Sequence, residues 1–212
     1  TKNRALASSK ISIKNALILL LTLLVIGFLI LIQLNFEAII LGIVITPLIA
    51  LYPLAKRFFI LPQFILALTY NWGCFIGWAA LGSNIPFSSI FILYLSLIFW
   101  TLAYDTIYAT QDEKEDKNLN LYSSTLLFGS KKMIFLNLMI ITKYFLIIFY
   151  GSSLDFGFIF NILVLTISLI NLLDLNLIWK NKPENASSYF SRNNYYGISL
   201  LFSILIGSHF NV

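Results

Sequence analysis

Charged residues are scarce in this chain. Of its 212 residues only 11% are Asp, Glu, Lys or Arg, whereas 59% are hydrophobic, and the mean hydropathy is +0.87. Soluble domains carry roughly a quarter charged residues. The composition therefore excludes an ordinary soluble domain and predicts an integral membrane protein.

Cysteine and histidine are almost absent as well. The single cysteine, Cys74, excludes an internal disulfide and a cysteine-based metal cluster. The single histidine, His209, lies near the end of the chain without a nucleophile or metal ligand beside it. The net charge of +5 does not indicate nucleic acid as a partner, because the basic residues form no cluster.

Long apolar stretches fill most of the chain. Seven of them are near the ~20 residues that a helix needs to cross a bilayer. They cover residues 15–34, 36–54, 60–81, 87–110, 133–150, 156–178 and 195–211. We therefore predict an all-α fold, a polytopic membrane bundle of about seven transmembrane helices in contact with lipid. Gly73, Gly77 and Gly82 have a spacing that favours close helix packing in the third span.

The basic residues indicate the orientation. If the chain crosses the membrane seven times, every Lys and Arg except Lys143 falls in loops on one face. By the positive-inside rule that face is cytoplasmic, or the matrix in a mitochondrion. We expect a multi-pass protein of the bacterial inner membrane, with the mitochondrial inner membrane as the alternative.

The sequence YDTIYATQDEKED over residues 104–116 is the unusual passage. If the fourth span continues as a helix, Asp105, Asp112 and Asp116 fall within about 20° of one line, with Tyr108 at its edge. Carboxylates together with substrate phosphates are typical ligands of Mg²⁺. The alternative is a solvated charged loop, which explains residues 113–117 but not Asp105 at the end of an apolar helix.

The same passage closely resembles the second aspartate-rich motif of the UbiA-type intramembrane aromatic prenyltransferases. Its wording is most similar to the 4-hydroxybenzoate polyprenyltransferases of ubiquinone synthesis. Other segments match the family in the same order: TKNRALASS at 1–9, YPLAKR at 52–57, LPQ at 61–63, NWG at 71–73, and FSRNN at 190–194 followed by Gly197.

The resemblance implies a nine-helix fold, of which this chain has about seven helices. The family's first motif, N-D-x-x-D-x-x-x-D, does not occur here. We therefore expect residues 1–212 to form a single membrane-embedded prenyltransferase domain, the C-terminal portion of a family protein. We also expect it to be inactive without the second carboxylate row.

The resemblance further implies Mg²⁺-dependent transfer of a polyprenyl group from polyprenyl diphosphate to the ring of 4-hydroxybenzoate. Asp105, Asp112 and Asp116 would hold the metal, and these three with Tyr108 would be the catalytic residues. The expected substrate-binding residues are Arg4, Lys56, Arg57, Asn71, Lys114, Lys117, Asn193 and Asn194. Lys114 or Lys117 would replace a family lysine that is missing from NLYSS at 120–124.

Several alternatives remain at this point. Lys56 and Arg57 could mark only the topology, and aromatic residues such as Tyr70, Trp72 and Trp78 could pack rather than shelter a carbocation. The acceptor could be haem, naphthoate or chlorophyllide. The chain could instead be a cation transporter or an inactive remnant. Other enzymes of ubiquinone synthesis are expected partners if the enzyme assignment holds.

Overall fold

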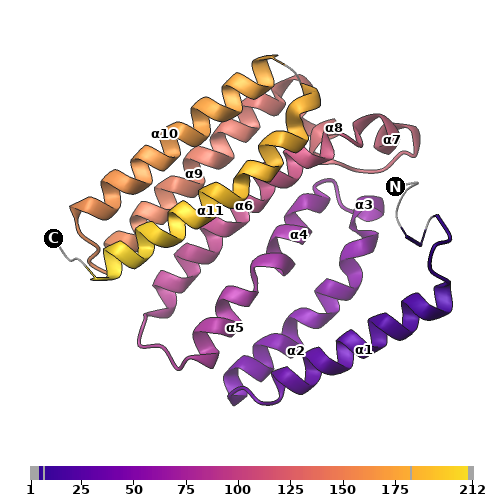
Figure 1. Ribbon diagram of the computed structural model, residues 1–212, viewed down its shortest axis with the longest axis horizontal. Helices are drawn as coiled ribbons and strands as arrows, with labels where there is room; N and C mark the ends of the chain where they lie inside the picture. The colour runs from indigo at the N-terminus through magenta and orange to yellow at the C-terminus, as the bar shows by residue number, and fades with distance from the viewer. Residues whose placement is uncertain (1–4, 7, 182, 210–212) are drawn as a thin grey trace.

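The computed structural model describes residues 5–6, 8–181 and 183–209, and within them it contains helices and no strand (Figure 1). The elements in chain order are α1 (Ile13–Leu31), α2 (Phe36–Leu51), η1 (Tyr52–Leu54), α3 (Ala55–Phe58), α4 (Pro62–Asn71), α5 (Gly73–Ala80), α6 (Phe87–Ala109), α7 (Glu113–Asn118), α8 (Ser124–Phe128), η2 (Gly129–Lys131), α9 (Lys132–Ser152), α10 (Phe158–Asn181), η3 (Pro183–Asn185) and α11 (Ala186–His209).

Local sequence signals account for several helix starts. The side chains of Ser12 and Asn35 accept hydrogen bonds from backbone N–H groups in the first turns of α1 and α2, as N-cap residues do. Pro62 opens α4 at its first position, where the missing N–H costs nothing. The expected all-helical class is thereby confirmed.

In the described part of the chain, five helices are long and apolar enough to cross a membrane. They cover Ile13–Leu31, Phe36–Phe58, Phe87–Ala109, Ser124–Ser152 and Phe158–Leu177. They correspond to five of the seven expected spans. The other two differ in form. The expected span 60–81 is divided into α4 and α5 at Trp72. The described part of the expected span 195–211 lies in α11, which begins at Ala186 and ends at His209, and residues 210–211 lie outside the described residues.

Figure 1 shows that the helices run back and forth between two ends of the molecule. The connections that carry α3, α7 and α8 lie at one end, and the turn from α10 to α11 lies there too. Basic residues gather at this end, namely Lys56, Arg57, Lys114, Lys117, Lys131, Lys132 and Arg192. This arrangement agrees with the orientation expected from the positive-inside rule.

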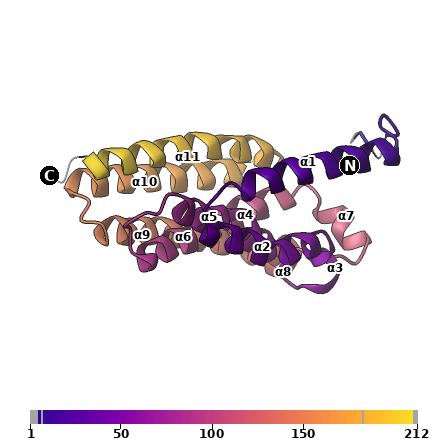
Figure 2. The ribbon, with the colours of Figure 1, turned by 90° about the horizontal axis from the view of Figure 1, so that it is seen from below.

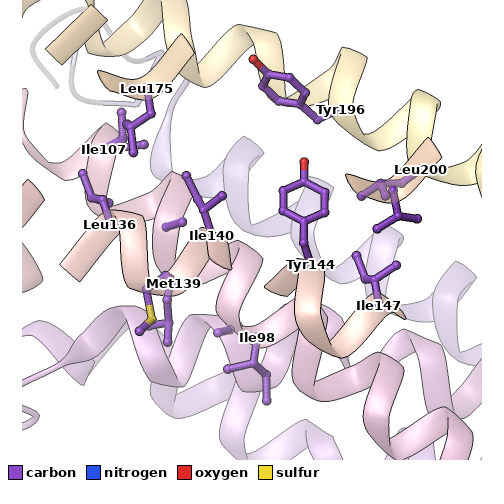
Figure 3. Packing of buried hydrophobic residues seen from close by; sticks show 14 of the residues in the cluster. Ile98, Ile107, Leu136, Met139, Ile140, Tyr144, Ile147, Leu175, Tyr196 and Leu200 are labelled. Atoms are coloured by element: carbon purple, nitrogen blue, oxygen red, sulfur yellow. The ribbon is translucent and has the colours of Figure 1, made fainter. Parts of the chain in front are cut away.

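Helix α6 lies at the centre of the packing and contacts α4, α9 and α11. Helices α10 and α11 form a layer on one side of α6 and α9 (Figure 2). Buried side chains from α6, α9, α10 and α11 meet between these layers (Figure 3). By contrast, α1 has no residue buried against the described chain. The outward faces of the helices are rich in exposed Leu, Ile and Phe, as lipid-facing surfaces are.

Candidate functional site

A cavity of about 780 Å³, here named the main cavity for its position between the long helices, lies between α4, α6 and α11. Each helix contributes residues at helical spacing, so that one face of each helix is turned to the cavity. The lining consists of Leu66, Tyr70, Asn71, Leu97, Trp100, Thr101, Tyr104, Phe190, Asn193, Asn194, Gly197 and Ile198. Three of the predicted substrate-binding residues, Asn71, Asn193 and Asn194, therefore share one cavity.

Asn71 joins α4 to α6. Its side-chain amide donates to the hydroxyl of Thr101 at 2.7 Å and to the carbonyl of Leu97 at 3.2 Å, both on α6, and to the carbonyl of Ala67 at 2.8 Å. A polar side chain inside a membrane span needs such partners. Asn71 thus has a structural role at the wall in addition to its predicted contact with substrate.

The two asparagines of α11 differ in their surroundings. Asn193 accepts a hydrogen bond from the indole N–H of Trp100 at 3.1 Å, and its amide donates to the carbonyls of Tyr189 and Phe190. Asn194 is exposed and makes no side-chain hydrogen bond with a described residue. Asn194 therefore has the freer amide for a ligand, whereas Asn193 fixes the cavity wall.

Asp105 lines a second, smaller cavity. This space of about 120 Å³ is also lined by Tyr52, Lys56 and Gln63. In this cavity Asp105 of the aspartate motif on α6 lies beside Lys56 of the YPLAKR segment on α3. Two segments that lie far apart in the sequence, both predicted to contact substrate, thus meet at the basic end of the molecule.

The expected single row of carboxylates is wrong in its geometry. Helix α6 ends at Ala109, residues 110–112 form a turn, and a new helix, α7, begins at Glu113. In the turn, the N–H groups of Thr110, Gln111 and Asp112 each donate to the carbonyl three residues earlier, at 3.1–3.2 Å. These bonds replace the helical pattern, so Asp112 and Asp116 do not continue the face of Asp105.

Asp116 is held by Lys56. The ammonium of Lys56 donates to both carboxylate oxygens, at 3.0 and 2.9 Å. The side chain of Asp116 is only 6% exposed, compared with 40% for that of Lys56. The backbone N–H of Tyr122 also donates to the Lys56 carbonyl at 2.8 Å. The ion pair therefore ties the segment after α6 to α3.

The remaining predicted residues lie near the site or apart from it. Tyr108 is 38% exposed, with its ring 5.1 Å from that of Phe190. Lys114 and Lys117 line a different cavity, of about 1050 Å³, between α7 and α8. Arg57 is exposed on α3. Arg4 lies outside the described residues.

The carboxylates can be compared with what a divalent cation requires. No group of three or more His, Cys, Asp or Glu gathers for a metal among the described residues. The carboxylates of Asp105 and Asp112 make no hydrogen bond or ion pair with the described chain, whereas both oxygens of Asp116 are occupied by Lys56. One or two free carboxylates fit Mg²⁺ if phosphate oxygens complete its shell.

Sequence reasoning missed Trp100 and Thr101 of the main cavity, and it quoted Tyr104 and Gly197 within the family-like segments without giving them a role in the site. A signal was available, because residues 97, 100, 101 and 104 follow the spacing i, i+3, i+4, i+7 that places side chains on one helix face. The cavity-lining residues of α11 have the same spacing from 190 to 198. Trp72 and Trp78, by contrast, donate to the carbonyls of Leu41 and Ile85 and do not line the cavity.

Comparisons with known proteins identify relatives of this chain. The model of the UbiA prenyltransferase family matches residues 1–201. A 4-hydroxybenzoate octaprenyltransferase of Francisella tularensis subsp. novicida is 36% identical over 206 residues, which cover 97% of this chain and 72% of the relative. A mitochondrial 4-hydroxybenzoate polyprenyltransferase of Drosophila pseudoobscura pseudoobscura is 39% identical over 137 residues, 65% of this chain and 34% of the relative.

A solved structure shares the fold. It comes from work on digeranylgeranylglyceryl phosphate synthase in membranes, and it superposes with a TM-score of 0.69 at 21% identity, covering 97% of this chain and 74% of that chain. The apolar helices and the bacterial relatives make this chain a multi-pass inner-membrane protein. With the family match over nearly its whole length, the chain belongs to the UbiA prenyltransferase family.

Proposed function

We propose that the chain is the part of an enzyme that transfers a polyprenyl group from polyprenyl diphosphate to the ring of 4-hydroxybenzoate, with Mg²⁺, as a step of ubiquinone biosynthesis, and that it requires the second carboxylate row for turnover. One observation carries this proposal: three segments that resemble family motifs meet at one cavity. They are the segments that contain Asn71, Tyr104 and Asn193, and Asp105 follows directly at the basic end. The names of the relatives support the choice of acceptor.

The basic end would receive the diphosphate. Lys56 is 40% exposed and shares the small cavity with Asp105, so its ammonium can also reach phosphate oxygens while it stays paired with Asp116. Family members generally use a divalent metal, and we assign Mg²⁺ to Asp105 and Asp112. Bound there, Mg²⁺ would neutralise the diphosphate and stabilise it as a leaving anion.

The main cavity would hold the prenyl chain and the aromatic acid. Its walls combine apolar side chains with the π faces of Tyr70, Trp100 and Tyr104. In the reaction the bond between the prenyl C1 and the diphosphate oxygen breaks, and diphosphate leaves with the electron pair. A carbon–carbon bond then forms at the ring position ortho to the hydroxyl, and that ring carbon loses its proton. Each aromatic face stabilises the intermediate allylic cation by roughly 0.5–2 kcal/mol.

Binding to the purified chain in lipid nanodiscs tests the donor assignment. We expect saturable binding of S-farnesyl thiodiphosphate, a prenyl donor analogue that is not transferred, and we expect this binding to require Mg²⁺. Asp105→Asn should weaken binding at least tenfold, whereas Glu115→Gln, an exposed acid on α7, should not. Equal binding of farnesol, which lacks the diphosphate, would contradict the proposal.

A further inference from the structure

Lys143 is a buried basic residue that the proposed reaction does not use. It lies in the middle of α9 with only 1% of its surface exposed. No carboxylate forms an ion pair with it among the described residues. A lysine at such a depth is costly in a membrane protein and commonly has a function. A hydrophobic residue of similar length would fill the same space without that cost.

The ammonium is instead placed against aromatic rings. Its nitrogen lies 4.5 Å from the centre of the Trp100 ring and 3.9 Å from that of Tyr144. Such contacts stabilise a cation electrostatically, most strongly over tryptophan. Trp100 belongs to α6 and lines the main cavity. Lys143 therefore contacts a residue that lines the main cavity, although Lys143 itself is not among the lining residues.

Trp100 is also held from α11. Its indole N–H donates to Asn193 at 3.1 Å. Gly197, one turn further along α11, allows close approach, since a Cβ placed there would lie 3.1 Å from the Cη2 atom of Trp100. The Trp100 indole is thus held by the side chain of Lys143, by its hydrogen bond to Asn193 and by the close approach of Gly197.

Lys143 is connected to the outer helices through Tyr144. The hydroxyl of Tyr144 accepts a hydrogen bond from Asn171 of α10 at 3.0 Å, and Asn171 accepts one from Tyr189 of α11. All of these side chains are buried, and Tyr144 lies in the core shown in Figure 3. The ammonium therefore lies between the cavity wall and a polar network that joins α9, α10 and α11.

We propose that Lys143 is a positioning residue, which holds the Trp100 indole in place as a fixed wall of the main cavity and so sets the fit of the prenyl donor. The part that concerns the donor rests on the proposed function. The part that concerns Trp100 rests only on the contacts above. Asn193 and Gly197 of the FSRNN segment act through the same indole.

The test uses the full chain labelled with 5-fluorotryptophan in nanodiscs. The chain contains four tryptophans, and Trp100→Phe identifies the fluorine resonance of Trp100. Lys143→Met removes the amine while keeping a side chain of similar length, and Lys143→Arg keeps a basic side chain. Lys131→Met is the control, because Lys131 is exposed in η2, directly before α9. Binding of S-farnesyl thiodiphosphate is measured on each variant.

We expect Lys143→Met to shift and broaden the Trp100 resonance and to weaken analogue binding about tenfold. Lys143→Arg should restore both, and Lys131→Met should change neither. Gly197→Ala should also move this resonance, because the added methyl group would lie 3.1 Å from Cη2 of the Trp100 indole, and alanine suits a helix. If Lys143→Met leaves both the Trp100 resonance and analogue binding unchanged, the proposal is overturned. If Lys143→Met does not fold, a Gly197→Ala variant that leaves the Trp100 resonance unchanged overturns it instead.

The two proposals fail in different ways. If the wild-type chain does not bind the analogue, the assignment of the prenyl donor fails, while the fluorine resonance still decides whether Lys143 positions Trp100. If the wild type binds and Lys143→Met binds equally well with a shifted resonance, Lys143 orders the indole without setting the fit, and the positioning proposal fails.

Discussion

At the scale of single residues, the acids of residues 105–116 have different environments despite their common motif. Asp105 and Asp112 keep free oxygens within the described chain, whereas both oxygens of Asp116 are bound by Lys56. The sequence pattern treats all three as equivalent. The difference arises from a lysine that lies 60 residues away from Asp116 in the chain, and no local pattern contains that contact.

The free carboxylates lead to the first prediction. In a catalytically complete enzyme that contains this chain, Asp105→Asn and Asp112→Asn should each lower kcat about 100-fold or more, because loss of one charge-stabilising group costs roughly 3 kcal/mol in the transition state. Initial rates of prenyl transfer measure this effect. Glu115→Gln is the control on the exposed face of α7. A rate loss in the control as large as in Asp105→Asn would show that removal of any negative charge in this segment lowers the rate, and that Asp105 has no specific role.

The ion pair of Lys56 leads to the second prediction, which concerns stability. Lys56→Met leaves the carboxylate of Asp116 buried at 6% exposure without its partner, and loss of one partner of a buried pair is strongly destabilising. Asp116→Asn leaves a lysine that is 40% exposed and can be hydrated. We expect Lys56→Met to lower the melting temperature more than Asp116→Asn does. The reverse order would mean that the pair is not formed in the folded protein.

At the scale of helices, the glycines differ in how closely another helix approaches them. The spacing of Gly73, Gly77 and Gly82 allows close helix packing in the third span, but no described side chain approaches these glycines closely. A Cβ placed at any of these positions meets nothing within 4 Å in the described structure, whereas one at Gly151 of α9 would lie 2.1 Å from the ring of Phe160 on α10. The tight approach depends on which helix lies opposite, and spacing alone does not specify the neighbour.

The third prediction follows from these positions. Gly151→Ala should destabilise the protein by about 1–3 kcal/mol, because the methyl group forces α9 and α10 apart. Gly77→Ala is the matched control, and it should be neutral or stabilising by up to about 1 kcal/mol, since alanine favours a helix. Unfolding of the purified variants in mild detergent gives both values. Equal destabilisation of the two variants would contradict the α9–α10 packing.

The breaks between helices were the least predictable features at this scale. Hydropathy predicts one span over residues 60–81, yet α4 and α5 separate at Trp72. There Gly73 weakens the helix, and the Trp72 indole donates to the carbonyl of Leu41 of α2 at 3.0 Å. The expected span 87–110 ends within one residue of α6, but the assumed continuation of this helix to Asp116 is wrong, because the chain turns at residues 110–112 and the non-local Lys56–Asp116 contact ties the following segment to α3. Long apolar helices such as α9 and α10 were predictable because lipid fixes their length.

At the scale of the whole molecule, the orientation in the membrane gives the fourth prediction. In a Cys74→Ala background, a cysteine at Ser83 should react with a membrane-impermeant maleimide added from outside. A cysteine at Asn118 should react only after the cytoplasmic side is opened. The physical reason is the basic end, which includes α3 and α7 (Figure 1) and which the positive-inside rule places in the cytoplasm. Labelling of Ser83 only from the cytoplasmic side would reverse the assignment of the substrate face.

The orientation in the membrane stays a prediction. The sequence predicted the class of fold, because lipid imposes long apolar helices, and it placed among its candidate residues three that line the main cavity, Asn71, Asn193 and Asn194. It did not predict the roles of Trp100 and Lys143. Those roles depend on the packing of α6 against α9 and α11, and the sequences of these helices do not specify which helix lies next to which.

The most direct test of the account is prenyl transfer to radiolabelled 4-hydroxybenzoate. The chain is joined to the part of the Francisella relative that it does not match and is assayed in membranes that lack their own enzyme. We expect an organic-extractable product that requires Mg²⁺ and farnesyl diphosphate and that falls about 100-fold or more with Asp105→Asn. A chimaera that inserts and binds the donor analogue but forms no product, or an Asp105→Asn variant that forms as much as the wild type, would contradict the account.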